Sequence, residues 1–248
     1  MSERLATQSL PKIFSVPQVL LLDMSSREDM ILIKPDDAVN RSSTYFSERI
    51  ISSIMSSGQV DVIGLGPSIS IASSAVNISA DIANVHIHEV TLDYVEFPVL
   101  GKYEVIVFSL KNVSLEKPLA LLARQLDENM KLTIDREGQL VVISARQAIE
   151  RTVQMCLWKL SNFERVKILA AGSAITNAAR TALTITKGDI SREPVFIELI
   201  SFGRFEKTRG GPPKPITSIH IYLRKGKGKE SARHKKLLAS IKSQIRSY

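Results

Sequence analysis

The stretch Val60-Asp-Val-Ile-Gly-Leu-Gly66-Pro-Ser-Ile-Ser-Ile-Ala72 has a counterpart 106 residues later, Val166-Lys-Ile-Leu-Ala-Ala-Gly172-Ser-Ala-Ile-Thr-Asn-Ala178. In both stretches an apolar run ends at a glycine, and a helical pattern begins three residues beyond it. Self-similarity at a constant offset is typical of a repeated structural unit. We therefore expect the chain to fold as two copies of one unit.

The patterns around the two stretches also recur in the same order. A β-rich run comes first, and an amphipathic helix, the quoted strand and helix, and two further strands follow it. In the first unit we expect Met30–Lys34, Phe46–Ile54, Val60–Leu65, Ile69–Asp81, Glu89–Phe97 and Tyr103–Leu110. In the second unit we expect Leu140–Ser144, Ile149–Leu160, Val166–Ala170, Ile175–Thr186, Val195–Phe205 and Ile216–Arg224. The order β-α-β-α-β-β predicts an α+β fold, in which each unit has a mixed sheet with two helices on one face.

Further elements are expected outside these units. Gln18–Asp23 and Lys131–Asp135 each form an extra strand that precedes a unit, and Leu115–Met130 forms a helix. The predicted organisation is a first unit with its N-terminal extension (1–112), a connector of helix and strand (113–138), a second unit (139–226) and a basic C-terminal helix (227–248).

The composition excludes several classes of protein. The chain has 248 residues, of which 44% are hydrophobic, so it can bury a core. No apolar run reaches the roughly 18–20 residues of a membrane span, and the N-terminus has no signal-peptide core, so we expect a cytoplasmic protein that does not enter a membrane. Cys156 is the only cysteine, which excludes an internal disulfide and any cysteine-based metal cluster.

The charge is divided unequally between the two halves. Residues 1–138 hold 12 basic and 18 acidic residues, whereas residues 139–248 hold 21 basic and 7 acidic residues. The net charge is therefore −6 for residues 1–138 and +14 for residues 139–248. An excess of this size favours a polyanion as the partner of the second half, although a merely solvated basic surface would have the same composition.

The loop between the last two strands differs between the copies. In the first unit it is short and carries only Lys102, whereas the second unit has the long basic stretch 204–215, rich in glycine and proline. That composition predicts an extended arm that contacts phosphates. The arm contains Arg204, Lys207, Arg209 and Lys214, and further basic residues follow closely in the sequence: Arg224, Lys225, Lys227 and Lys229.

A second basic region is expected where the first helix of the second unit begins. Arg146 lies at this turn, and Arg151 and Arg180 lie on nearby helical surfaces. Gly172, Ser173 and Thr176 stand at a helix N-terminus, whose free amides can bind a phosphate. Ordinary helix capping by Ser173 explains that residue equally well.

The stretch from Leu140 to Lys225 resembles the Alba family of archaeal chromatin and RNA-binding proteins, through the turn at Arg146, the Ala-Ala-Gly172-Ser-Ala-Ile-Thr run and the basic hairpin. Residues Met30 to Lys111 look like a diverged second copy. The resemblance implies a tandem pseudo-dimer that holds a duplex between hairpin arms. It also has departures: Ala145-Arg146 replaces the family's lysine pair, and Ala171-Gly172-Ser173 replaces its Arg-Gly-Arg-like run.

No catalytic or metal-binding set stands out in the sequence. There is no phosphate-binding Gly-x-x-x-x-Gly-Lys-Ser/Thr loop, and Gly64-Leu-Gly66 lacks the third glycine of a dinucleotide-binding motif. His86 and His88 alternate on one strand, but no third ligand follows at a typical spacing. We therefore expect no enzyme activity, no metal and no cofactor.

The sequence thus predicts a non-enzymatic protein that binds DNA or structured RNA mainly through phosphates, with the first unit as the pseudo-dimer partner. Association with the chromosome and assembly as a homodimer are compatible with this prediction. The alternative is a scaffold subunit of a larger ribonucleoprotein or chromatin assembly, in which the acidic first unit contacts another protein.

Overall fold

The computed structural model describes residues 29–83, 85–97, 101–112, 139–188, 190–191, 193–207 and 214–228. The two predicted extra strands, the helix predicted at 115–130 and the predicted C-terminal helix lie outside the described residues and stay predictions. The domain limits predicted within 113–138 and beyond 228 stay predictions for the same reason.

Both units contain the predicted order of elements. The first unit consists of β1 (Met30–Ile33), α2 (Asp37–Asn40), α3 (Ser43–Ser57), β2 (Gln59–Leu65), η2 (Gly66–Ser68), α4 (Ile69–Ile82), β3 (Val85–Phe97) and β4 (Gly101–Asn112). The second consists of β5 (Leu140–Ile143), α6 (Ile149–Asn162), β6 (Arg165–Ala171), η4 (Gly172–Ala174), α7 (Ile175–Lys187), β7 (Val195–Lys207) and β8 (Lys214–Lys225). Only the one-turn helix α2 and the two 3-10 turns were not predicted as separate elements.

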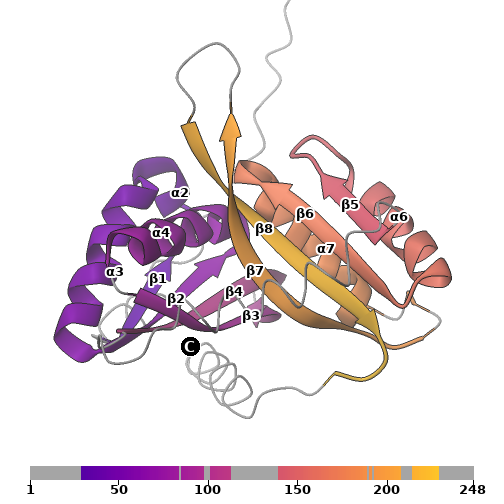
Figure 1. Cartoon of the computed structure of the whole chain (residues 1–248), viewed down its shortest axis with the longest axis horizontal. Helices are drawn as coiled ribbons and strands as arrows, with labels where there is room; N and C mark the ends of the chain where they lie inside the picture. The colour runs from indigo at the N-terminus through magenta and orange to yellow at the C-terminus, as the bar shows by residue number, and fades with distance from the viewer. Residues whose placement is uncertain are drawn as a thin grey trace, which may run out of the picture.

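Each unit forms one mixed four-stranded sheet. The strand orders are β1-β2-β4-β3 and β5-β6-β8-β7. In both sheets the first pair of strands is parallel and the other two pairs are antiparallel. Helices α3 and α4 cover one face of the first sheet, and α6 and α7 cover one face of the second (Figure 1). The predicted α+β class with two mixed sheets is confirmed.

Local sequence explains where α3 begins and ends. Ser42 caps its N-terminus, because the Ser42 hydroxyl accepts a hydrogen bond from the Tyr45 amide at 3.2 Å. Gly58 ends the helix in the left-handed conformation, with φ of 75°. Between these residues Phe46, Ile50 and Ile54 form a buried stripe, as their spacing predicted.

The two quoted glycines provide the turn from strand to helix. Gly66 and Gly172 have φ of 49° and 56°, in a region that residues with a Cβ adopt at a cost of about 1–2 kcal/mol. The 3-10 turn that starts at each glycine leads directly into α4 or α7. Gly64 has a different role, because a Cβ there would lie 2.7 Å from the Cβ of Ala72. The small residue therefore allows α4 to pack closely on β2.

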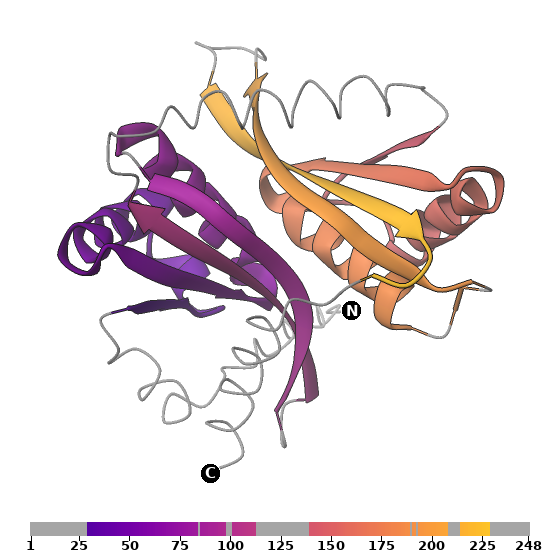
Figure 2. The same ribbon diagram turned by 60° about the horizontal axis from the view of Figure 1, so that its bottom comes forward.

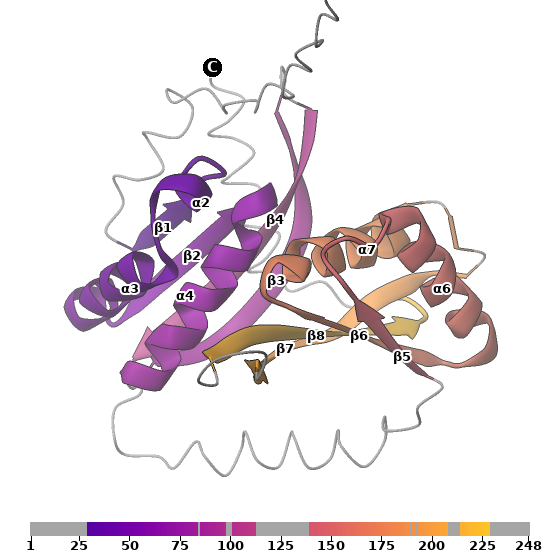
Figure 3. The same ribbon diagram turned by 90° about the horizontal axis from the view of Figure 1, so that it is seen from above.

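The two units pack against each other through α4 and α7. Helix α4 contacts α7 and β8, and α7 in turn contacts β3 and β4. Figures 2 and 3 show the two sheets on either side of this helical contact. The rings of Phe108 on β4 and Phe202 on β7 meet with their centroids 5.3 Å apart. The units thus meet in part through apolar side chains.

No helix in the described ranges combines the length and the apolar character needed to cross a membrane.

Candidate nucleic-acid interface

The register of the second sheet places Arg146 and the β7–β8 hairpin at the same end. Ile143 on β5 pairs with Ala170, which pairs with Ile219 on β8, and Ile219 pairs with Phe202 on β7. Beyond this row β5 leads into the turn that carries Arg146, and β7 leads into the hairpin, at the same end of the sheet. Figure 1 shows the turn after β5 and the hairpin toward the same upper edge of the molecule.

The hairpin is a regular ladder for much of its length. Strand β7 extends five residues beyond Phe202 to Lys207, and this last residue pairs with Lys214. At about 3.3 Å per residue the paired strands project roughly 17 Å past the row of Phe202. The sequence predicted an extended arm from 204 onward, and that prediction needs correction, because residues 204–207 and 214–215 belong to the strands. Arg209 lies outside the described residues.

The turn that carries Arg146 is held in place by α7. The Asn177 side-chain amide donates a hydrogen bond to the Ala145 carbonyl at 3.1 Å. The Gln147 amide also donates to the Ser144 carbonyl at 3.2 Å, which closes the turn. Arg146 itself is exposed, and within the described residues no carboxylate pairs with it. A fixed turn therefore presents a solvent-facing guanidinium.

The N-terminus of α7 adds to the positive potential beside this turn. Neither η4 nor α7 has a side-chain cap within the described part of the chain, so the prediction of Ser173 as a capping residue is wrong. Ser173 is exposed, and Thr176 is half-buried. Uncapped amides carry a partial positive charge, which supports Arg146 in attracting an anion.

Arg204, at the base of the hairpin, has an acidic partner. Its guanidinium forms an ion pair with Asp81 at the end of α4, in the first unit. About half of the Arg204 side chain is exposed. A phosphate would therefore have to compete with Asp81 for this guanidinium, in contrast to the situation at Arg146.

Arg224, Lys225 and Lys227 lie at the opposite end of the second sheet. Lys225 follows Lys214 by eleven positions along β8, which corresponds to roughly 36 Å. The guanidinium of Arg224 donates to Glu164 at 2.7 Å and to Glu198 at 3.1 Å, and these hydrogen bonds raise its pKa.

The other cations at this end differ in their surroundings. Lys225 pairs with Glu193 at 3.7 Å, Lys227 is exposed, and Lys229 lies outside the described residues. The predicted cations therefore form two separate groups, one at each end of the sheet.

The corresponding turn of the first unit has charged side chains that are paired with each other. Asp37 accepts a hydrogen bond from the Lys34 amide at 2.9 Å and lies 3.7 Å from the guanidinium of Arg41. Arg41 also stacks on the ring of Tyr45, 4.9 Å from its centroid. Arg41, which follows this turn in the first unit, is thus paired with a carboxylate, in contrast to the exposed Arg146.

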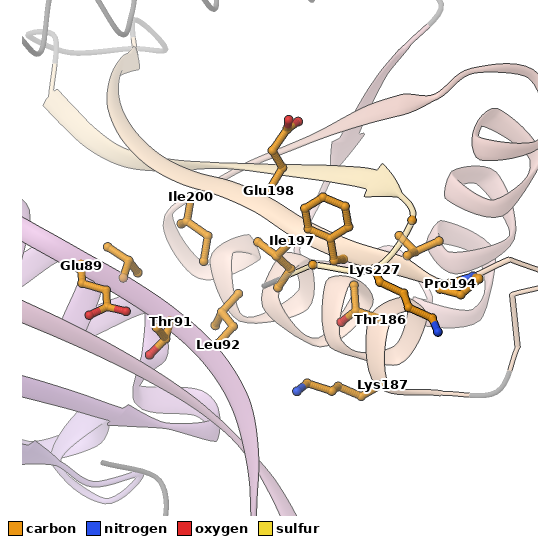
Figure 4. Close-up of a pocket in the computed structure, with 15 residues that line it drawn as sticks. Glu89, Thr91, Leu92, Thr186, Lys187, Pro194, Ile197, Glu198, Ile200 and Lys227 are labelled. Carbon is orange, nitrogen blue, oxygen red and sulfur yellow. The ribbon is translucent and has the colours of Figure 1, made fainter. Parts of the chain in front are cut away.

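A cleft of about 670 Å³ lies between the two units, near the end distant from the hairpin. Figure 4 shows Glu89, Thr91 and Leu92 of β3 facing Ile197 and Ile200 of β7 across it.

The described residues contain no group of three side chains suited to hold a metal. His88 is exposed, at the bulge of β3, and His86 is half-buried, without a third ligand among the described side chains.

Sequence reasoning missed two residues that shape the interface. Asp81, which pairs with Arg204, and Asn177, which holds the Arg146 turn, are distant in sequence from the side chains that they contact. No sequence signal identifies either contact, because both depend on how α4 and α7 pack.

Comparisons with known proteins leave the family of this chain open. No protein-family model matches the sequence, and no curated protein sequence matches it. Among solved structures, the crystal structure of ALBA1 from Trypanosoma brucei matches with 19% sequence identity and a TM-score of 0.31, over 46% of this chain and 91% of that one. The resemblance to the Alba family therefore stays a prediction, and the evidence for function lies in the geometry of the chain itself.

Proposed function

We propose that this protein is a non-enzymatic nucleic-acid-binding protein that grips phosphates with the hairpin end of its second unit. The observation that supports this most is the sheet register, which brings the exposed Arg146 and the basic hairpin to one end. The ligand class is DNA or structured RNA. The setting that we propose is cytoplasmic, with chromosome association if the ligand is DNA.

Phosphate contacts account for the expected affinity. Cations that neutralise phosphates release condensed counterions, and this release supplies most nonspecific binding. Helices α6 and α7 pack on the sheet, and the sequence contains no dedicated base-reading helix, so base readout is expected to be weak. A projecting two-stranded arm suits a groove, where arginine responds to width more than to sequence.

The first unit is proposed to support the second without binding the ligand itself. Its equivalent turn holds Arg41 in an ion pair with Asp37, so it offers less positive charge to a phosphate than the exposed Arg146 of the second unit. A duplex would therefore contact the molecule asymmetrically, mainly through the second unit.

Two matched triple variants test this assignment. The first replaces Lys207, Arg209 and Lys214 by alanine, and the control replaces Lys225, Lys227 and Lys229 by alanine. At about 0.9 per phosphate contact, the hairpin variant should flatten the plot of log affinity against log salt by about 3 and the control should leave it nearly unchanged. Fluorescence anisotropy with duplex DNA, duplex RNA and single strands measures both slopes across a salt series.

A further variant, Arg146→Ala, should reduce the slope by about 1. Equal losses in the two triple variants would assign binding to the whole basic surface and contradict the hairpin site. Absence of binding to every nucleic acid in the wild-type chain would favour the scaffold alternative.

A further inference from the structure

The contacts between the two units form two sets related by the pseudo-two-fold arrangement. The offset of 106 between Gly66 and Gly172 makes Asp81 on α4 equivalent to Lys187 on α7. The bulges of β3 and β7, after Ile87 and Ile197, give an offset of 110 for those strands.

This second offset makes Arg204 equivalent to Tyr94, the neighbour of Asp93 in β3. The end of α7 thus contacts β3, and the end of α4 contacts β7, at nearly equivalent positions of the two strands.

The charges at these outer contacts are exchanged between the two sides. On one side Lys187 at the end of α7 lies 3.5 Å from Asp93 on β3. On the other side Asp81 at the end of α4 pairs with Arg204 on β7. The helix contributes the cation in one pair and the anion in the other.

The inner contacts are also unequal. Arg180 on α7 donates from Nε and Nη2 to the two oxygens of Glu104 on β4, at 2.6 and 3.2 Å. The position of β8 that is equivalent to Glu104 holds Thr217, which accepts a hydrogen bond from Asn77 of α4 at 3.4 Å. Glu104 is 7% exposed, so its charge depends on Arg180.

We propose that these exchanged charges make each unit selective for the other, so that the second unit does not pair with another copy of itself. Two second units arranged in this way would place Lys187 against Arg204 and leave Arg180 facing the neutral Thr217. Two first units would place Asp81 against Asp93 and would leave buried Glu104 without its guanidinium. Like charges at both outer positions disfavour each like pair, and opposite charges favour the mixed pair.

This selectivity assigns the first unit a role that does not involve nucleic acid, which is to cover the contact face of the second unit. The basic unit has an apolar contact face, and Phe202 and the face of α7 would otherwise be available to other chains. The first unit covers that face within the same chain, where the tether gives it a high effective concentration. The partner that this surface fits is therefore the first unit of this same protein.

Reversal of one charge in the full chain tests the proposal. The carboxylate introduced by Arg204→Asp repels Asp81 within the chain. The second unit also becomes complementary to itself, because Lys187 of one copy can then pair with the new carboxylate of another. We expect sedimentation and light scattering to show a concentration-dependent shift from one chain toward two. Arg204→Ala, the matched control, removes the pair without creating self-complementarity, and it should keep the mass of the wild-type protein.

The double variant Asp81→Lys, Arg204→Asp restores an opposite pair within the chain. It should return the protein to the wild-type mass and recover the melting temperature lost in Arg204→Asp. If Arg204→Asp fails to fold, recovery of folding in the double variant still supports the proposal, and no recovery contradicts it. A monomeric Arg204→Asp chain with the same stability as Arg204→Ala would overturn it. None of these measurements needs a nucleic acid, so they are independent of the proposed function.

Discussion

Arg146 and Arg204 have the same side chain and lie at the same end of the second sheet, yet their surroundings differ. Arg146 lies on a turn that Asn177 holds, with its guanidinium exposed. Arg204 pairs with a carboxylate of the first unit. At the scale of single residues, the availability of a cation for phosphate depends on its neighbours in space.

Cys156 shows the effect of surroundings on a single thiol. It lies in the stripe of α6 that faces the core and is fully buried. Burial raises the pKa of the Cys156 thiol from 9.0 to about 12, and nearby Lys159 only partly opposes this shift. The sequence prediction that this cysteine belongs to the core is confirmed.

We predict that Cys156 reacts very slowly with thiol reagents in the native protein. At pH 8 the folded chain should hold about three orders of magnitude less thiolate than the unfolded chain, given the two pKa values, 9.0 and about 12. Ellman's reagent should label the protein fully in guanidinium chloride and hardly at all without it. Rapid labelling of the native chain would contradict the burial.

The same shift predicts a loss of stability at alkaline pH. The folded pKa lies above the unfolded one, so the stabilisation is fully present below pH 9 and is lost as pH rises toward 12. Between these values the free energy of unfolding should fall more steeply in the wild type than in Cys156→Ala, by about 1.4 kcal/mol per pH unit. Urea titrations at several pH values measure both slopes, and parallel slopes would show that this thiol stays protonated in both states.

At the scale of elements, packing of helix on helix decides how buried polar groups are satisfied. Helices α6 and α7 meet through a hydrogen bond of 2.9 Å between the hydroxyls of Thr152 and Thr181. Thr152 also hydrogen-bonds the Ile149 carbonyl at 2.7 Å, whereas its partner has no second contact of this kind among the described residues. Both threonines are completely buried.

The two threonines should therefore respond differently to replacement by valine. Thr152→Val leaves the Thr181 hydroxyl buried without its partner and should cost about 1–3 kcal/mol of unfolding free energy. Thr181→Val leaves Thr152 bonded to its own helix and should cost less than about 1 kcal/mol. Urea denaturation of both variants tests this order, and equal costs would mean that the pair acts symmetrically.

The form of the β7–β8 hairpin is also decided at the scale of elements. Glycine and proline at 210–213 predicted an irregular arm from residue 204 onward, but residues 204–207 pair in antiparallel register with residues 214–217. A paired arm loses less conformational entropy on binding than a free loop would.

At the scale of the whole molecule, the mixed pairing of the two units depends on the contact between Arg180 and Glu104. The hydrogen bonds that Arg180 donates to Glu104 raise the pKa of Arg180, so its guanidinium stays charged. The carboxylate is buried, and the guanidinium remains about two-fifths exposed. This pair therefore links the two units through a shielded carboxylate on Glu104 and a partly solvated Arg180.

We predict that Arg180→Ala lowers the unfolding free energy by about 2–3 kcal/mol, because it leaves the buried Glu104 charge unpaired. Lys187→Ala, the matched control on the same helix, removes a contact of 3.5 Å to Asp93, which still accepts a hydrogen bond from the Tyr94 amide at 2.7 Å, and should cost less than about 1 kcal/mol. Guanidinium denaturation followed by circular dichroism measures both losses. Similar losses of unfolding free energy in the two variants would indicate that water hydrates the Glu104 carboxylate when Arg180 is removed.

The sequence alone determined the elements and their order in both units. Spacings of three and four placed the buried stripes of α3 and α6, and the glycines at 66 and 172 marked the turns, because these features depend only on local backbone geometry. Helix α2 was missed, since its four residues offer no complete period of apolar side chains.

Only the tertiary structure decided which charges lie together. Arg224 follows Lys214 by ten residues in the sequence, but an extended strand carries it to the far end of the sheet, where it bonds Glu164 and Glu198. Asp81 meets Arg204 across 123 positions because α4 packs beside the second unit. Electrostatic energy depends on distance through space, and sheet register and helix packing set that distance.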